Sequence, residues 1–183
     1  DQLGAFSCEI LEATAAAVID DPLRLDAMLA CLELLDATLP ERQPHPELHA
    51  ATLAFLGALA DPAGPGALLV RWETGLLAAL GFGLDLSRCA ATGSTLDLAY
   101  VSPRSGRAVS RGGAGPLADR LLRLPQFLVT RAAGATIPDI ADGLALTGHF
   151  IERHLLAPAG RLMPPARGRV IERLAREVRL RAP

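Results

Sequence analysis

The chain has 183 residues, of which 50% are hydrophobic and 21% are charged, and its formal net charge is −2. These values are typical of one globular domain, or of one core with a small insert, and they exclude a disordered chain. All 18 basic residues are Arg, which excludes enzymes that depend on a phosphate-binding or Schiff-base lysine.

The composition favours helices, because Leu contributes 34 residues and Ala 33, whereas aromatic residues total only seven. Charge is distributed unevenly along the chain. Residues 1–61 contain eleven acidic and two basic residues, and residues 62–183 contain nine acidic and sixteen basic residues, which gives −9 and +7. We interpret these stretches as solvated helix faces, and a basic binding face in the second part is the alternative.

Apolar residues recur at spacings of three and four through residues 1–86 and predict four amphipathic helices. The apolar stripes are Leu3 to Ala17 (with Phe6 and Ile10), Leu25 to Leu39, Leu48 to Leu59 and Leu69 to Leu80. Asp21-Pro22 is typical of a helix start, and Gly81-Phe82-Gly83 is typical of a helix end. Four such helices with short connections predict a helical bundle.

Residues 87–115 differ in composition, with five Ser and four Arg. Residues 98–101 alternate in polarity, a turn follows at 102–106, and the chain returns over 107–110, which predicts a β-hairpin in a loop-rich insert. The predicted fold is therefore mainly α, with the bundle in two parts (1–86 and 116–183) around the insert.

Helices are expected to resume after Pro116, with a capping box from Thr136 to Asp139. In the final helix we expect Ile171, Leu174 and Val178 to face inward and Arg167 to lie on another face. The carboxylates of the chain are expected on helix exteriors.

The spacing of four residues in the insert is that of a zinc ribbon. Cys89 and Thr92 are followed, 17 residues later, by Ser110 and Gly113, so that cysteines at all four positions would give C-x₂-C-x₁₇-C-x₂-C. Only Cys89 can supply a thiolate, and a structural zinc site needs four ligands. From the residues alone we favour an ordinary Gly/Ser loop with an incidental cysteine, and the alternative is a zinc-ribbon-like insert without metal, in which Cys89 is a remnant. We predict no cofactor.

Other polar residues give little support for catalysis. No G-x-S-x-G, G-x-G-x-x-G or H-E-x-x-H motif is present, and we predict no enzyme. His45 and His49 lie four residues apart around Glu47 and would bind zinc only with a third ligand, so we interpret them as surface or capping residues. His149 and His154 are expected on different faces. A hydrolase or zinc enzyme of unrecognised type is a further hypothesis.

Three cysteines form no disulfide framework, and no apolar run reaches the roughly 18 residues of a membrane helix. We therefore expect a cytoplasmic protein without a membrane partner. Because the chain begins at Asp1 rather than Met, we interpret it as a fragment.

Four stretches, in this order, resemble the RecO family of bacterial recombination mediators. They are CLELLDATLPERQPHPEL (31–48), RWETGLLAALGFGLDLSRCAATGS (71–94), DLAYVSPRSGRAVSR (97–111) and GHFIERHLLAPAGRLMPPARGRVIERL (148–174). The resemblance implies the helical part of such a protein, with its zinc-ribbon-like insert and without the N-terminal OB-fold. Some members carry four zinc cysteines, whereas this chain keeps only Cys89.

The resemblance implies a role in DNA repair and homologous recombination, with RecR, in loading RecA onto gaps covered by single-stranded DNA-binding protein (SSB). Expected partners are single- and double-stranded DNA, RecR and the SSB C-terminal tail, and the expected location is the nucleoid. The tail is expected at an apolar notch beside an arginine, formed by Arg71, Trp72, Leu76 and Leu80. Phosphates are expected at Arg88, Arg104, Arg107, Arg111, Arg120 and Arg123.

Several alternatives to these assignments stay open. Trp72 and the leucines are equally well explained as core residues, and Tyr100 either stacks on a base or packs in the hairpin. Without the OB-fold we expect weak DNA binding. A helical scaffold or regulatory domain with no role on DNA is the second hypothesis for the whole chain.

Overall fold

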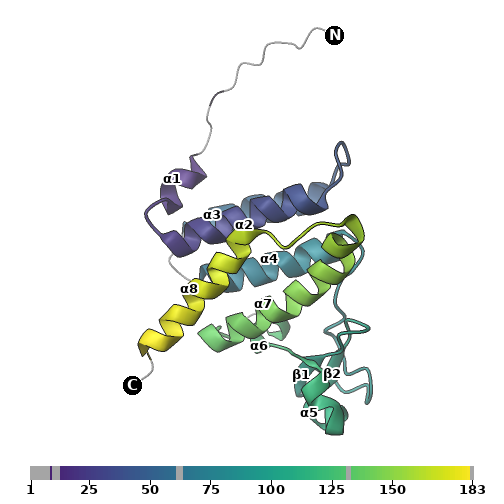
Figure 1. Ribbon diagram of the computed structural model, residues 1–183. Helices are drawn as coiled ribbons and strands as arrows, with labels where there is room; N and C mark the ends of the chain where they lie inside the picture. The colour runs from purple at the N-terminus through teal and green to yellow at the C-terminus, as the bar shows by residue number, and fades with distance from the viewer. Residues whose placement is uncertain (1–8, 10–12, 61–63, 131–132, 182–183) are drawn as a thin grey trace.

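A computed structural model describes residues 9, 13–60, 64–130 and 133–181. The described chain is mainly helical, with eight α-helices and one small sheet, as predicted. Figure 1 shows the long helices as one bundle, with the strands at one end and one short helix beside them. The helices are α1 (Thr14–Val18), α2 (Pro22–Thr38), α3 (Pro46–Ala58), α4 (Pro65–Ala79), α5 (Arg111–Ala114), α6 (Gln126–Val129), α7 (Ile137–Ile151) and α8 (Pro165–Arg181).

Local sequence signals position several helix ends. The Asp21 carboxylate accepts hydrogen bonds from the backbone N–H of Leu23 and Arg24, at 3.0 and 3.1 Å, and confirms the predicted start of α2. Thr136 and Asp139 form the predicted capping box of α7. The helix predicted from Leu3, Phe6 and Ile10 lies mostly outside the described residues.

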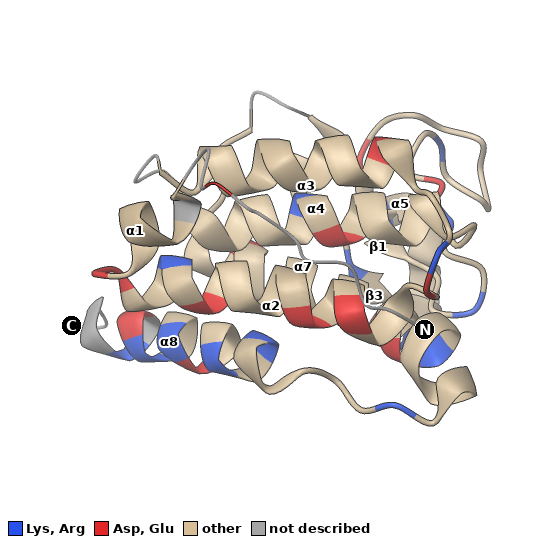
Figure 2. Ribbon diagram, turned by 90° about the horizontal axis from the view of Figure 1, so that it is seen from above, with Lys and Arg blue, Asp and Glu red and all other residues tan. Residues whose placement is uncertain are grey.

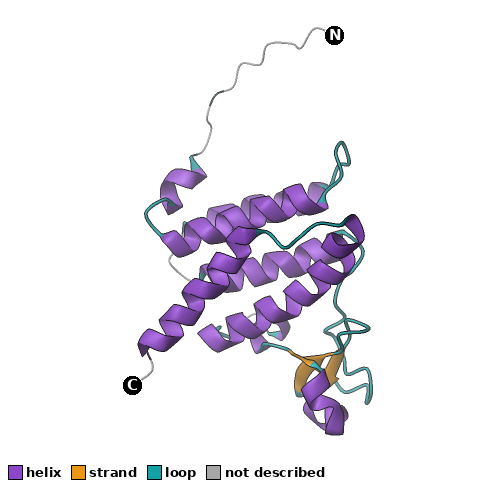
Figure 3. Ribbon diagram, viewed as in Figure 1, coloured by secondary structure: helices purple, strands orange, loops and turns teal. Residues whose placement is uncertain are grey.

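The bundle core forms where α2, α4, α7 and α8 pack together, with α3 against α4. Its largest fully buried side chains are mostly leucines, including Leu34, Leu69, Leu76 and Leu144, together with Ile151. Since α2 and α8 pack side by side, the two bundle parts predicted on either side of the insert share one core. Figure 3 shows the sheet outside this helical body.

The sheet has three antiparallel strands in the order β2-β1-β3. They are β1 (Leu98–Val101), β2 (Ala108–Ser110) and β3 (Leu122–Arg123). The first two form the predicted hairpin, with Tyr100 opposite Val109. The third strand was not predicted, and it lies beyond Pro116, where helix was expected. A 3₁₀ helix (η1, Gly115–Arg120), β3 and the short α6 occupy that region instead, because the chain first returns to pair with β1.

The predicted inward position of Ile171 on α8 is wrong. Ile171 is 40% exposed, and α8 instead buries Ala166, Val170 and Leu174. Val178 lies among the side chains that are not described.

The carboxylates are not all exterior, since Glu73 and Asp26 are both buried. The Arg167 side chain is also buried, with its Nε 2.7 Å from Glu73 Oε1. Asp26 lies between Arg169 and Arg173 of α8, each at 2.6 Å. The basic α8 thus neutralises acidic residues on α2 and α4, and Figure 2 shows it beside α2.

Candidate nucleic-acid interface

The insert is joined to the bundle by backbone hydrogen bonds after α4. The Asp85 N–H donates to the Gly106 carbonyl at 3.0 Å, and the Asp85 carbonyl accepts from Ala108 N–H at 2.8 Å. On the other side, Arg153 Nη1 donates to the Pro103 carbonyl at 3.1 Å, and His149 Nε2 lies 3.1 Å from the same oxygen. The turn of the hairpin is therefore fixed between the end of α4 and the end of α7.

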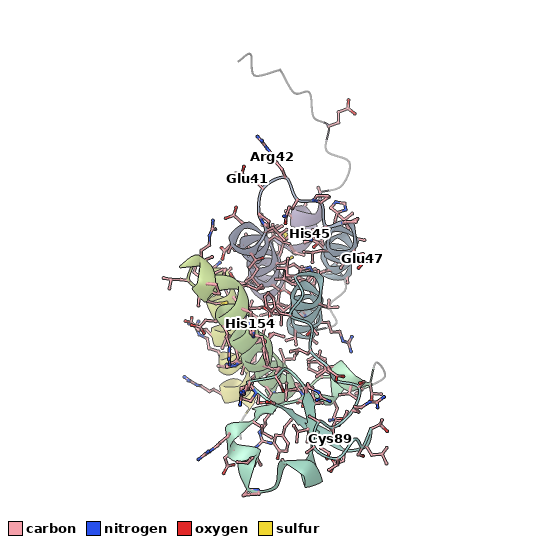
Figure 4. All side chains as sticks on the ribbon, turned by 90° about the vertical axis from the view of Figure 1, so that its right-hand side faces the viewer. Glu41, Arg42, His45, Glu47, Cys89 and His154 are labelled. Atoms are coloured by element: carbon pink, nitrogen blue, oxygen red, sulfur yellow. The ribbon has the colours of Figure 1, made fainter. Side chains whose placement is uncertain are left out.

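The four zinc-ribbon positions lie together in the insert. The buried Cys89 Sγ accepts hydrogen bonds from the Thr92 backbone N–H at 3.4 Å and from Ser110 Oγ at 3.3 Å. A Cβ added at Gly113 would be 2.8 Å from the same sulfur. The Ser110 hydroxyl also accepts from Gly113 N–H at 3.1 Å, so hydrogen bonds connect all four positions. Figure 4 shows Cys89 inside the insert.

The donor chemistry of this cluster does not fit a structural zinc ion. One thiol, two hydroxyls and a glycine stand where a closed site uses four thiolate or imidazole ligands. Burial opposes ionisation of Cys89, but the hydrogen bonds from Ser110 and Thr92 outweigh it and lower the pKa of Cys89 to about 6. The negative sulfur then attracts the hydroxyl and N–H dipoles that surround it, and this attraction stabilises the insert.

The six arginines expected at DNA all have exposed side chains on the insert or its exit. Two of them have acidic partners: Arg107 lies 3.6 Å from Asp85, and Arg111 lies 3.6 Å from Asp97. The other four form no ion pair with any residue in the described part of the chain; they are Arg88, Arg104, Arg120 and Arg123. Arg123 stands opposite Tyr100 across β1 and β3, and the Tyr100 side chain is half-buried. These unpaired guanidinium groups are free to contact phosphates.

The four residues expected at the SSB tail do not share one surface. Trp72 and Leu76 are 4% and 0% exposed, and Trp72 Nε1 donates to Thr52 Oγ1 at 3.1 Å within the core. Leu80 is half-buried. Arg71 is exposed and turns toward α6, where its Nη2 donates to the Phe127 carbonyl at 3.2 Å. Only Arg71 and Leu80 are thus accessible to a peptide.

His45 and His49 lie at the start of α3, where His45 shares a pocket with Ala79 at the end of α4. Both line a cavity of about 180 Å³ between the end of α2 and the start of α3. His45 precedes α3, yet its side chain makes no capping hydrogen bond. Among the residues that the structure describes, no group of three or more potential metal ligands is present.

Sequence reasoning missed a cluster at the junction of bundle and insert. Phe82, which follows α4, stacks on His154, and His154 stacks on Phe150 of α7. A π-helical turn (η2, Glu152–Leu156) carries His154, followed by a 3₁₀ turn (η3, Ala157–Ala159). His149 also contacts the Phe150 edge, so the histidines expected on different faces are linked through one ring. In the sequence, only the i,i+4 spacing of Phe150 and His154 indicated that these two rings could stack.

Comparisons with known proteins identify relatives over nearly the whole chain. The family model described as "Recombination protein O C terminal" matches residues 19–162. A protein of Phenylobacterium zucineum named "DNA repair protein RecO" is 50% identical over 98% of this chain and 74% of its own length. Proteins of the same name from Rhodospirillum centenum and Rhodospirillum rubrum are 52% and 51% identical, over 69% and 72% of their lengths. No solved structure gives a significant match.

A helical bundle with a small sheet and an arginine-bearing insert, together with these relatives, defines a class: proteins of DNA repair and recombination. Within that class, the chain belongs to the RecO family. Across the described ranges, no helix is both long and apolar enough to cross a membrane.

Proposed function

We propose that this chain is the helical part of a non-catalytic recombination mediator that binds DNA through its insert. In this proposal it also binds the SSB tail and acts with RecR, at the nucleoid in the cytoplasm, to load RecA on single-stranded gaps. We infer the DNA contact from four exposed arginines that lack acidic partners within the described residues. Family membership supports the repair role.

The DNA contact is tested by removing three of these charges. We expect the triple variant Arg104→Gln, Arg120→Gln, Arg123→Gln to bind labelled oligonucleotides more weakly in fluorescence anisotropy. Because each phosphate contact releases counterions, the slope of log K against log salt should become shallower by about 2 to 3. Wild type should bind with a Kd above about 1 µM at moderate salt, typical of non-specific phosphate contacts.

The matched control removes three exposed arginines outside the insert, with the triple variant Arg42→Gln, Arg176→Gln, Arg179→Gln. It has the same net charge as the first variant and should bind DNA like wild type. Equal losses in both variants would contradict a contact at the insert. No binding by wild type would favour the alternative of a helical scaffold, in which arginines such as Arg107 and Arg111 serve only their aspartate partners.

The tail contact is tested with a labelled peptide of the SSB C-terminus and with a peptide that lacks its final apolar residue. Since Trp72 and Leu76 are covered, the proposed contact depends on the exposed Arg71 guanidinium, which would pair with tail carboxylates. Arg71→Ala should weaken binding about tenfold, as expected for loss of a charged hydrogen bond. Arg161→Ala, also exposed, is the control. Equal binding by wild type and Arg71→Ala would place the tail elsewhere.

A further inference from the structure

Three rings form a stack at the junction of the bundle and the insert, which we call the aromatic column (Phe82, His154 and Phe150). The Phe82 and His154 centroids are 4.8 Å apart with planes inclined by 15°. The His154 and Phe150 centroids are 6.0 Å apart with planes inclined by 7°. Phe150 is 2% exposed and Phe82 is 40% exposed, so the column leads from the core to solvent and ends in an open ring. Figure 4 shows His154 between the bundle and the insert.

The backbone holds Phe82 in this exposed position. Gly81 has φ +88°, which ends α4, and the Phe82 N–H donates to the Leu77 carbonyl at 2.8 Å. A Cβ on Gly83 would lie 3.3 Å from the Ala78 Cα, so the chain runs close along the helix end. The backbone before and after Phe82 is therefore held against the end of α4, so the exposure of Phe82 does not come from a loose loop.

His154 provides a flat, neutral support beneath Phe82. Burial, and secondarily the charges of Arg153 and His149, lower the pKa of His154 below its usual value. At neutral pH the ring is therefore an uncharged imidazole that packs between two phenyl rings. The column supports Phe82 on His154, and the 40% exposed side chain of Phe82 is accessible to a further planar ring.

The surroundings of the column are basic. The Arg153 guanidinium donates to the Pro103 carbonyl beside Arg104, and both arginines are exposed. The hairpin turn touches the column, since a Cβ added at Gly106 would lie 3.7 Å from the Phe150 ring. Of the nearby acids, Asp85 accepts from Ser87 and pairs with Arg107, which leaves Glu152 as the exposed acidic neighbour in this part of the chain. The charge and the flat open ring together suit a polyanion with planar groups.

We propose that Phe82 is a stacking platform for an unpaired base of single-stranded DNA, with Arg104 and Arg153 at the flanking phosphates. The inference rests on the proposed DNA-binding function and names its ligand. In a duplex both faces of each base are covered by neighbouring bases, so only a single strand can supply a free face. Every base has such a face, and the platform therefore prefers single strands without reading sequence.

The test measures binding of a fluorescein-labelled single-stranded oligothymidylate and of a duplex of equal length to the 183-residue chain. We expect Phe82→Ala to weaken single-strand binding about 5- to 150-fold, the range for loss of one base–aromatic stack. Duplex binding should change less than about twofold, and Phe82→Trp should restore single-strand binding. Leu117→Ala, which removes another exposed apolar side chain of the chain, is the control and should bind like wild type.

A second reading uses an oligonucleotide with one 2-aminopurine, whose fluorescence reports stacking. Wild type and Phe82→Trp should change this fluorescence on binding, and Phe82→Ala should not. Unchanged single-strand affinity in Phe82→Ala would overturn the proposal, as would equal weakening of single strands and duplex in a variant that melts like wild type. The proposed function fails separately, when wild type binds no DNA or the insert arginine variant loses nothing.

Discussion

At the scale of single residues, the buried Glu73 carboxylate is the most demanding group in the molecule. It accepts hydrogen bonds from Arg167 Nε at 2.7 Å and Nη2 at 3.1 Å, and from the Thr147 hydroxyl. The Arg167 guanidinium lies over Gly148, where an added Cβ would come within 2.9 Å of Nη2. A charge in the core is tolerated only with such partners, so α4, α7 and α8 must meet in one arrangement.

Arg167→Met should therefore destabilise the protein strongly. The substitution leaves Glu73 buried without its cationic partner, and we expect a loss of about 3–5 kcal/mol in the free energy of unfolding. Urea unfolding followed by circular dichroism measures this loss. Arg179→Met, on the exposed part of the same helix, should change stability by less than about 0.5 kcal/mol. A loss below about 1 kcal/mol for Arg167→Met would mean that water reaches the carboxylate.

At the scale of elements, the insert shows how polar contacts hold a small sheet against a helical bundle. Three short strands bury little surface, and hairpins of this size are marginal alone. Here the loop after α4 is joined to β2 by hydrogen bonds to Cys89 Sγ, and the turn is fixed by Arg153 and His149. The insert thus depends on polar contacts whose strength varies with the ionisation of one sulfur.

This dependence predicts a pH effect on Cys89→Ala. The folded-state pKa of Cys89 is about 6, below its model-peptide value of 9.0, so the thiolate contribution is complete above pH 9 and is lost as pH falls through 6. The destabilisation by Cys89→Ala should accordingly increase from pH 6 to pH 8.5, measured by urea unfolding.

Cys31→Ala is the matched control for this experiment. Burial, with a contribution from Glu73, raises the pKa of Cys31 to about 12, so its thiol stays protonated in the folded chain, and in the unfolded chain it ionises only in part by pH 8.5. Its destabilisation should stay constant over the same range. A constant cost for Cys89→Ala as well would show that its sulfur remains protonated.

At the scale of the whole molecule, the sequence motifs predicted those features of the fold that depend on contacts between neighbouring residues. The Asp21 cap, the Thr136–Asp139 capping box and the β1–β2 hairpin depend on residues close in sequence, and each was predicted from a local sequence motif. The β3 strand and the buried pair of Glu73 and Arg167 depend on partners far away in the chain, and no periodicity indicates them.

The candidate interface, like the fold, was predictable from the sequence only in part. Arginines of the insert stand out by composition, whereas their aspartate partners and the position of Phe82 above His154 depend on how the insert packs on the bundle. Charge patterning alone also suggested an acidic and a basic part of the molecule. In the structure α8 packs on α2, so part of this asymmetry is neutralised inside the fold (Figure 2).

The ribosome synthesises the arginines of α8 long after the acidic residues of α2 and α4 with which they pair. Asp26 precedes its partner Arg169 by 143 residues, and Glu73 precedes Arg167 by 94 residues. At translation rates of about 5–20 residues per second, Glu73 waits roughly 5–20 s for its counterion. During that interval the helices before the insert hold carboxylates that cannot yet be buried, and the turn of the insert still lacks His149 and Arg153. The bundle therefore closes only when the last helix has emerged.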